Sequence, residues 1–286
     1  MFSLNCKGKM LTLEKPAVMG IINATPDSFY EGHLNDTKEI LLSRVAKMIV
    51  DGASIIDIGG QSTRPGSVQI NKNEESDRVL PIIELIHKTF PTTIISIDTY
   101  YSKVAKEAIL AGASMVNDIS AGKFDEEMIP IVASAKVPYI CMHMQGTPEN
   151  MQKNPVYKDI TNDILTFFIQ KVEECKKAGI LDIIIDPGFG FGKTIQHNFT
   201  LLKNLKMLSM IGYPILAGLS RKSLINKTLN IDQSKALNGT TVLNTLAIQN
   251  GASLLRVHDV KEAMETIQLF DAYINAVLNQ DGIDAI

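Results

Sequence analysis

Residues 52–59 of the chain read GASIIDIG, and the same Gly-Ala-Ser tripeptide recurs at residues 112–114 and 251–253. Each copy follows a helical pattern and precedes a short run of apolar, mostly β-branched residues. A glycine at this position can adopt the left-handed conformation that ends a helix. The tripeptide therefore predicts the point where a helix passes into the next strand of a parallel sheet.

Short apolar runs alternate with longer helical patterns along the whole chain. The predicted strands are Val18–Asn23, Ile55–Gly59, Ile94–Asp98, Met115–Asp118, Tyr139–His143, Ile183–Asp186, Ile215–Gly218 and Leu254–Val257. The predicted helices are Lys38–Val50, Glu74–Phe90, Lys103–Ala111, Glu126–Ala135, Asp159–Ala178, Phe199–Met210, Ala236–Gln249 and Lys261–Leu278. This alternation favours a closed (β/α)8 TIM barrel over its competitor, a doubly wound open sheet. We expect one α/β domain over residues 1–286, with the barrel core at about 17–275.

Composition excludes several classes of protein. The formal net charge is −3 and the pI is about 6.0, so no overall field attracts nucleic acid or an anionic membrane. The first residues lack the apolar segment of a secretory signal, and no apolar run approaches the ~20 residues that cross a bilayer. We therefore expect a cytoplasmic protein that binds small molecules. Cys6, Cys141 and Cys175 have no CxxC spacing and are expected to be reduced structural residues.

The glycine-rich stretch at residues 184–194, IIDPGFGFGKT, has the outline of a phosphate-binding loop. A P-loop requires glycine at position 187, where Pro187 stands, and a dinucleotide fingerprint requires glycine at position 193, where Lys193 stands. We interpret the stretch as the sixth strand, which ends in Asp186, followed by a loop. Its glycines allow the backbone and the ring of Phe191 to lie close to a ligand.

Polar side chains stand where seven of the eight predicted strands end. They are Asn23, Asp57, Asp98, Asn117, Asp118, His143, Asp186, Arg256 and His258. The seventh strand ends in Gly218, and Ser220-Arg221-Lys222 follows directly. Because the carboxyl ends of barrel strands share one face, where the βα loops build the active site, we expect these residues to meet there.

Two sets of side chains at this face indicate the chemistry of a ligand. The cationic set is Arg64, Arg221, Lys222, Arg256 and His258, which suits a phosphate or diphosphate. The second set is Asp98, Asn117 and Asp186, which suits the donor edge of a planar heterocycle. Together they predict a flat, amino-substituted ring with an anionic tail.

Eight short motifs of the chain resemble those of a known family. The motifs are residues 20–29 GIINATPDSF, 57–66 DIGGQSTRPG, 96–99 SIDT, 117–119 NDI, 142–146 MHMQG, 186–193 DPGFGFGK, 220–223 SRKS and 256–260 RVHDV. In this order they are similar to the signatures of the dihydropteroate synthase family, from about residue 17 to about 275. The family often has Val at position 24, Glu at position 61 and a different loop after Phe29.

The resemblance implies a TIM-barrel transferase that joins 4-aminobenzoate to 6-hydroxymethyl-7,8-dihydropterin diphosphate. The products would be 7,8-dihydropteroate, for folate biosynthesis, and diphosphate. It also implies Mg²⁺ held by Asn23, a homodimer formed through helices away from the active site, and competition of sulfonamide drugs with 4-aminobenzoate.

The same resemblance implies the roles of individual residues. Asp98, Lys222, Arg256 and His258 are the implied catalytic residues. The wider set that binds substrate adds Thr63, Arg64, Pro65, Asn117, Met142, Asp186, Phe191, Gly218 and Ser220. Of these, Asp186, Asn117 and Asp98 would bind the pterin edges, Arg256 and His258 the diphosphate, and Thr63, Pro65, Phe191, Ser220 and Lys222 the aminobenzoate.

The sequence leaves three alternative functions open. One is a pterin-binding methyltransferase that works with a corrinoid protein, although it has no need of residues 62–66 or 256–258. A second is a paralogue that binds pterins without catalysis. The third is an aldolase that forms a Schiff base through Lys222.

Some residues have a plain structural interpretation. His143 is interpreted as a hydrogen-bonded core histidine, Lys193 as a solvated loop lysine, and Asp57 as a residue that orients its loop. The segments Ala24–Asn35 and Gly60–Asn73 are rich in Gly, Pro, Ser, Asn and Asp, so they are expected to be mobile loops without ligand.

Overall fold

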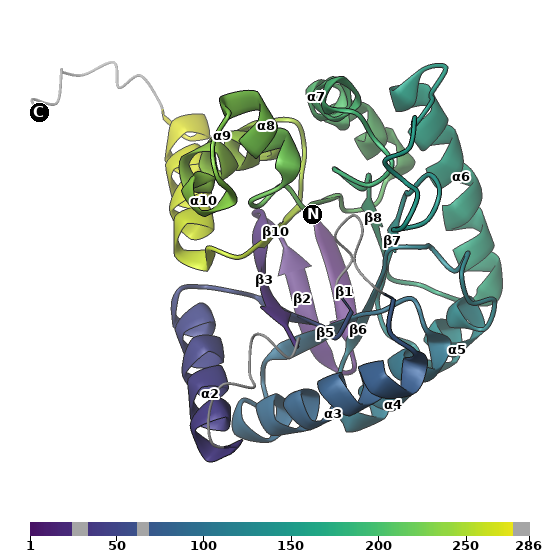
Figure 1. Ribbon diagram of the computed structural model, residues 1–286, viewed down its shortest axis with the longest axis vertical. Helices are drawn as coiled ribbons and strands as arrows, with labels where there is room; N and C mark the ends of the chain where they lie inside the picture. The colour runs from purple at the N-terminus through teal and green to yellow at the C-terminus, as the bar shows by residue number, and fades with distance from the viewer. Residues whose placement is uncertain (25–33, 62–68, 277–286) are drawn as a thin grey trace, which may run out of the picture.

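The computed structural model describes residues 1–24, 34–61 and 69–276, and its main element is a barrel of parallel strands inside a ring of helices (Figure 1). The barrel strands are β3 (Ala17–Asn23), β4 (Ile55–Gly59), β5 (Ile94–Asp98), β6 (Met115–Asp118), β7 (Tyr139–Met142), β8 (Ile183–Asp186), β9 (Leu216–Ala217) and β10 (Leu254–Val257). All eight match predicted strands to within one residue at either end. The fold is therefore the predicted TIM barrel of the α/β class.

The strand order excludes the doubly wound alternative. Strands β3 to β8 pair in chain order, and β10 pairs with β3 on one side and β9 on the other. An isolated parallel bridge between Ile185 and Ile215 joins β8 to the segment that leads into β9. The strand order of a doubly wound sheet reverses at a switch point. Here the order continues without reversal until β10 pairs with β3.

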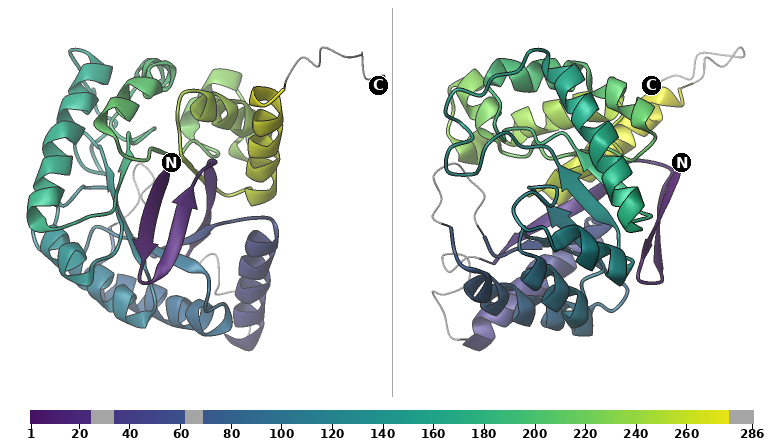
Figure 2. Two further views of the ribbon diagram at one scale, coloured as in Figure 1. Left: turned by 180° about the vertical axis from the view of Figure 1, so that it is seen from behind. Right: turned by 90° about the vertical axis from the view of Figure 1, so that its right-hand side faces the viewer.

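The helices lie outside the strands (Figures 1 and 2). They are α2 (Leu34–Val50), α3 (Lys72–Thr89), α4 (Ser102–Ala111), α5 (Met128–Ala135), α6 (Ile160–Ala178), α7 (Ile195–Lys203), α8 (Ser223–Leu229), α9 (Leu237–Gln249) and α10 (Val260–Ile274). In the ranges that the structure describes, no helix is long and apolar enough to span a bilayer.

The predicted helix Phe199–Met210 was wrong in its bounds. Helix α7 already begins at Ile195, because the Thr194 side chain accepts from the His197 amide in a capping box. It ends at Lys203, and a 3-10 helix, η1, covers Leu205–Ile211. Helix α8 and a second 3-10 helix, η2 (Gln233–Lys235), were not predicted either.

The Gly-Ala-Ser tripeptides end helices as predicted. Their glycines have φ between 95° and 124°. In each copy the alanine amide donates to a carbonyl five residues earlier in the helix, at 2.9 Å. The serine amide, at 2.8–2.9 Å, donates to the neighbouring strand or the segment leading into it. The tripeptide thus closes a helix and begins a strand ladder in three consecutive residues.

A hairpin that the sequence did not predict covers the amino ends of the strands. It pairs β1 (Phe2–Cys6) with β2 (Lys9–Leu13) in antiparallel fashion. Figure 2 shows it at one end of the molecule, outside the ring of helices. Its buried side chains join an apolar cluster built from strand starts, which comprises Leu4, Cys6, Leu11, Leu13, Ala17, Met19, Ile55, Ile94, Met115, Ile140, Ile184, Leu216 and Leu254. The hairpin therefore closes the amino end of the barrel.

The cluster gives a stability prediction. Replacing Leu4, which is 3% exposed, by Ala should lower the free energy of unfolding by roughly 3 kcal/mol, because the strand starts around it cannot collapse onto the smaller side chain. Met10 lies on the same hairpin but is 61% exposed, so Met10→Ala is a matched control that should change little. Urea unfolding measures both. Equal stabilities of the two variants would contradict the role given to the hairpin.

Candidate active site

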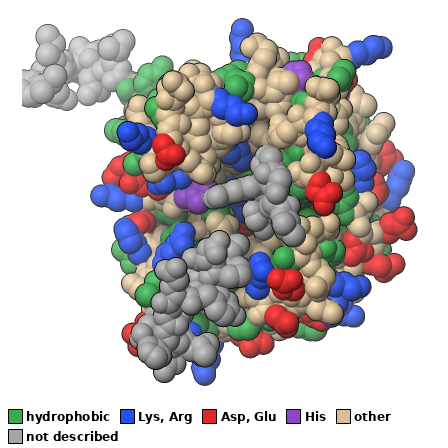
Figure 3. Space-filling view, in the orientation of Figure 1, with side chains coloured by type: hydrophobic (Ala, Val, Ile, Leu, Met, Phe, Trp, Pro, Cys, Tyr) green, Lys and Arg blue, Asp and Glu red, His purple; other side chains and the backbone are tan. Residues whose placement is uncertain are grey.

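The polar strand ends converge at the carboxyl end of the barrel. Asn23 is in register with Gly59, Gly59 with Asp98, and Asp98 with Asn117, so these residues form one row across four strands. Asp186 is in register with Met142 on the neighbouring pair of strands. Figure 3 looks at this side of the molecule, where side chains of both charges are dispersed over the surface. As the net charge implies, anion binding depends on local groups.

Arg256 on β10 is the centre of a buried charge network. Its Nε donates to Asp57 Oδ2 and its Nη2 to Asp98 Oδ2, both at 2.6 Å. Asp57 Oδ2 also accepts from Asn117 Nδ2 at 3.2 Å. Asp57 thus holds Asn117 on β6 and Arg256 on β10, while its interpretation as a residue that orients its own loop stays a prediction.

Charge and burial act against each other in this network. Burial raises the pKa of Asp98, and the Arg256 guanidinium lowers it. Burial also works against the Arg256 charge, but Asp57 and Asp98 raise the pKa of Arg256 above its usual range. The guanidinium is therefore permanently charged and fixed between two carboxylates.

A second electrostatic interaction links Asp186 and Lys222. Burial raises the pKa of Asp186 and the Lys222 ammonium lowers it, whereas burial lowers the pKa of Lys222 to about 8. Asp186 Oδ1 accepts from the Gly188 amide at 2.7 Å. The Lys222 ammonium donates to the Phe189 carbonyl and lies 4.7 Å from the centre of the Phe191 ring. Both residues are thus tied to the loop that follows β8.

The two other described cationic residues, His258 and Arg221, have different partners. His258 Nδ1 lies 3.0 Å from Ser220 Oγ, which joins the loops after β9 and β10. Arg221 instead forms a two-pronged ion pair with Asp259, at 2.6 and 2.8 Å. That Arg221 joins the anion-binding set stays a prediction, since its guanidinium has a carboxylate partner just as that of Arg256 does.

An apolar surface borders these charged groups. Tyr100, Ile119 and Met142 are buried together, and the Phe191 ring packs against them. Sequence reasoning chose Met142 and Phe191 but missed Ile119 and Tyr100. Ile119 lies in the quoted motif at residues 117–119, so the motif held a signal that we did not use. Tyr100 had no such signal.

Glycines bring the β8 loop against the segment that follows β7. Gly188 has φ +69°, and a Cβ there would lie 2.1 Å from the His143 carbonyl oxygen. Gly192 has φ +59°, and its Cβ would lie 2.5 Å from the Gln145 carbonyl oxygen. The close backbone approach inferred from the sequence is thus present, but it is made to another loop of the protein.

The interpretation of Lys193 as a solvated loop lysine was wrong. It is 3% exposed, and its ammonium donates to the carbonyl oxygens of Gly188, Phe191 and His143. His143 is buried as expected, and burial followed by the Lys193 charge lowers the pKa of the imidazole to about 3. The three carbonyl acceptors offset only part of the cost of burial, which lowers the pKa of Lys193 to about 7.

Other predictions concern residues that the structure does not describe. Thr63, Arg64 and Pro65 lie outside the described residues, as do positions 25–33 and 62–68 of the two expected loops. Asn23, the predicted ligand of Mg²⁺, is half-buried at the end of β3. The described residues contain no group of three or more His, Cys, Asp or Glu side chains placed to hold a metal ion.

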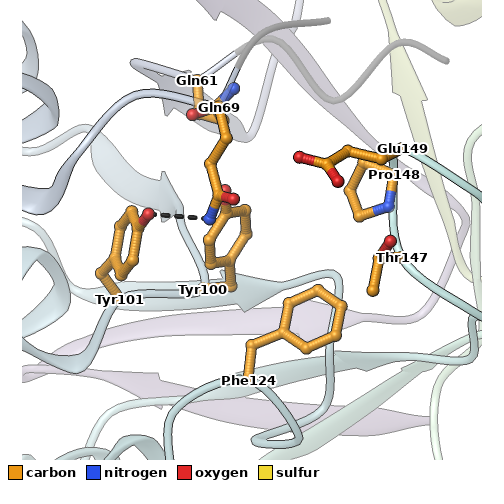
Figure 4. A pocket seen from close by; sticks show the side chains of 8 residues that line it. All are labelled: Gln61, Gln69, Tyr100, Tyr101, Phe124, Thr147, Pro148 and Glu149. Carbon is orange, nitrogen blue, oxygen red and sulfur yellow. Dashed lines mark hydrogen bonds between the residues drawn. The ribbon is translucent and has the colours of Figure 1, made fainter. Parts of the chain in front are cut away.

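A cavity of about 240 Å³ lies between the loops that follow β4, β5, β6 and β7 (Figure 4). Its lining residues are Gln61, Gln69, Tyr100, Tyr101, Phe124, Thr147, Pro148 and Glu149. The Gln69 amide donates to the Tyr101 hydroxyl at 2.9 Å across one side. None of the predicted site residues that the structure describes lines this cavity. Tyr100, Tyr101 and Phe124 connect it to the apolar surface described above.

Comparisons with known proteins agree with the motifs. A family model described as "Pterin binding enzyme" matches residues 19–258. The dihydropteroate synthase of Escherichia coli strain K12 is 39% identical over 279 residues, which cover 97% of this chain and 98% of the relative. The chain belongs to the dihydropteroate synthase family. The Bacillus subtilis member of the family is 41% identical over 264 residues, which cover 92% of this chain and 90% of the relative.

Solved structures of the family have the same fold. The Yersinia pestis dihydropteroate synthase, in a sulfonamide drug complex, has a TM-score of 0.90 at 39% identity and covers 96% of this chain and 100% of its own. The Xanthomonas albilineans enzyme with 4-aminobenzoic acid has a TM-score of 0.89 at 37% identity and covers 96% and 99%. A second structure of that enzyme, in complex with 7,8-dihydropteroate, has a TM-score of 0.86.

The contact of Gly188 with His143 gives a second stability prediction. Gly188→Ala should destabilise the protein strongly, because the added Cβ meets backbone and the positive φ is strained. Gly179 has φ +95° and open space around a built Cβ, so Gly179→Ala carries the strain without the contact. We expect the loss in Gly188→Ala to exceed that in Gly179→Ala by at least about 1 kcal/mol, measured by urea unfolding. Equal losses would show that the contact is unimportant.

Proposed function

We propose that this chain, as a single barrel domain, condenses 4-aminobenzoate with 7,8-dihydropterin-6-ylmethyl diphosphate to give 7,8-dihydropteroate and diphosphate. Family membership over nearly the whole chain supports the reaction. The observation that carries the proposal is the hydrogen-bonded network in which Asp57 and Arg256 join Asp98 and Asn117. Buried Asp186 and partly buried Lys222 interact with this network electrostatically. These groups supply donors and acceptors for a flat polar ring in a site shielded from water.

The pterin ring is recognised by complementary charge and hydrogen bonding. Asp186 accepts from the 2-amino group and ring N3, both of which are donors. Lys222 donates to the ring carbonyl oxygen. Asn117 and Asp98 bind the opposite nitrogen edge, while Ile119 and Met142 pack against the ring. Burial makes each of these polar contacts selective, because a ring without the matching group leaves a buried charge unpaired.

The reaction breaks the C–O bond between the pterin methylene and diphosphate and forms a C–N bond. The bond electrons leave with the diphosphate, whose charge Arg256 and His258 stabilise. The dihydropterin ring delocalises the methylene cation, and the nearby Asp98 carboxylate stabilises it. The neutral aniline nitrogen then attacks and releases one proton, so no strong base is required. We assign the aminobenzoate pocket to Phe191, Ser220 and Lys222, together with Thr63 and Pro65.

The residues present offer a magnesium ion one protein ligand. Asn23 offers one hard oxygen donor in line with the site, which suits a cation that keeps waters and takes its other ligands from a diphosphate. When bound, Mg²⁺ supplies charge neutralisation of the leaving group. We propose Asn23 as its protein ligand.

The test of this function uses a variant at the ring-binding carboxylate. Diphosphate release should require both 4-aminobenzoate and the pterin substrate. Asp186→Asn should weaken binding of the pterin diphosphate by roughly 2 kcal/mol or more, because the amide offers one acceptor where two ring donors need partners. Isothermal titration calorimetry measures this binding without 4-aminobenzoate.

The same assay contains its controls. Exposed Asp232→Asn makes the identical change away from the site and should bind like the parent. Excess EDTA should slow diphosphate release strongly, while binding of 6-hydroxymethylpterin without diphosphate stays unchanged. Parent-like affinity in Asp186→Asn would contradict the assignment of Asp186 to the pterin ring. If diphosphate release did not depend on 4-aminobenzoate, the proposed function would be wrong.

Two further features belong to this proposal. Three buried, unpaired cysteines suit a reducing compartment and support a cytoplasmic enzyme. A groove between α9 and α10 is partly apolar and supports a homodimer formed on this face. Leu269 and Tyr273 line the groove, and each is 74% exposed.

A charged side chain in the groove between α9 and α10 should prevent formation of the homodimer. Leu269→Glu should shift the mass measured by light scattering from dimer to monomer, because a buried carboxylate without a partner opposes association. Leu110→Glu on α4, at a position 79% exposed, is the matched control and should leave the mass at the parent value. A parent that is monomeric at all concentrations, or a dimeric Leu269→Glu variant, would contradict the proposed interface.

A further inference from the structure

Protein donors bind every carbonyl oxygen of the loop at residues 188–192. Gly188 accepts from the Phe191 amide and from Lys193, and Phe189 accepts from Lys222. The remaining donors are Gln152 Nε2 to Gly190 at 2.6 Å, Lys193 Nζ to Phe191 at 2.9 Å and Tyr157 Oη to Gly192 at 2.8 Å. The loop conformation therefore depends on side chains from outside it, since it has little secondary structure of its own.

Among these donors, Lys193 makes the most connections. Its ammonium lies 2.9 Å from the carbonyl oxygens of both Gly188 and Phe191, and 3.2 Å from that of His143. His143 Nδ1 lies at 3.2 Å as well. The first two contacts fold the loop onto itself, and the contacts to His143 tie it to the segment after β7. A lysine has three donors, and here all three are directed at backbone.

The loop in turn sets the positions of side chains assigned to the reaction. Gly188 donates its amide to Asp186 Oδ1, and Phe189 accepts from the Lys222 ammonium. Phe189 is buried in the main core, whereas the Phe191 ring packs against the apolar surface beside the site. A shift of this loop would move the pterin-binding pair and the aromatic ring together.

We infer that Lys193 is a positioning residue for the reaction: its buried ammonium fixes the loop at residues 188–192 and, through the loop, the placement of Asp186, Lys222 and Phe191. This inference rests on the proposed function, because it takes Asp186 and Lys222 as pterin-binding groups. Lys193 itself touches no substrate. Its contribution is to hold the geometry of groups that do, and small displacements of such groups are costly in both binding and rate.

The test replaces Lys193 by Met, which keeps the length of the side chain and removes its donors. We expect Lys193→Met to stay folded by circular dichroism and to bind the pterin diphosphate about tenfold or more weakly in calorimetry without 4-aminobenzoate. Lys193→Gln, whose amide restores two donors, should recover part of that affinity. Lys203→Met makes the same substitution at an exposed position of the neighbouring helix α7 and should bind like the parent.

The outcomes separate positioning from general stability. A folded Lys193→Met variant with pterin affinity within twofold of the parent overturns the inference, as does a Lys193→Gln variant no better than Lys193→Met. Loss of the fold in both variants also overturns it, because Lys193 is then a residue of the folding core. A parent that binds the pterin diphosphate but releases no diphosphate contradicts the proposed function alone and leaves the comparison of affinities intact.

Discussion

The site depends on one buried interaction, the Arg256 guanidinium held between the carboxylates of Asp57 and Asp98. It joins the ends of β10, β4 and β5, and Asn117 on β6 is added through Asp57. Removing one member would leave an unpaired charge away from water, which is far more costly than losing a surface ion pair. The network therefore stabilises the carboxyl end of the barrel while it keeps polar groups directed at a ligand.

The charged groups balance one another closely. The Lys222 ammonium interacts electrostatically with Asp186, and the Arg256 guanidinium binds Asp98, so a cation stabilises both of these buried carboxylates. This balance makes burial of the charges tolerable in the absence of substrate. It also means that a polar ring and an anionic tail enter a site whose dipoles are already arranged, which is the main way such a site lowers a reaction barrier.

Much of the fold was predictable because β-branched runs, helix caps and polar strand ends are local signals. The strand bounds at β4, β5, β6, β8 and β10 agree with prediction to the residue. The hairpin was missed because its apolar positions are few and its partners are distant in sequence. Lys193 was misread because its acceptors are backbone carbonyls, which no side-chain pattern reveals. The pairing of Arg221 with Asp259 was not foreseen because the two lie 38 residues apart. The positions of Thr63, Arg64 and Pro65 are not among those described.

The amino-terminal hairpin has a consequence for how the chain is made. Its apolar face leaves the ribosome well before Leu216 and Leu254, against which it packs, because these residues lie far later in the chain. The ladder between β3 and β10 has the same wide separation along the chain. Until β10 is synthesised, the growing polypeptide exposes both the hairpin face and an unpaired edge of β3. Completion of the barrel is thus a late event after translation of β10, and earlier intermediates carry surfaces that chaperones recognise.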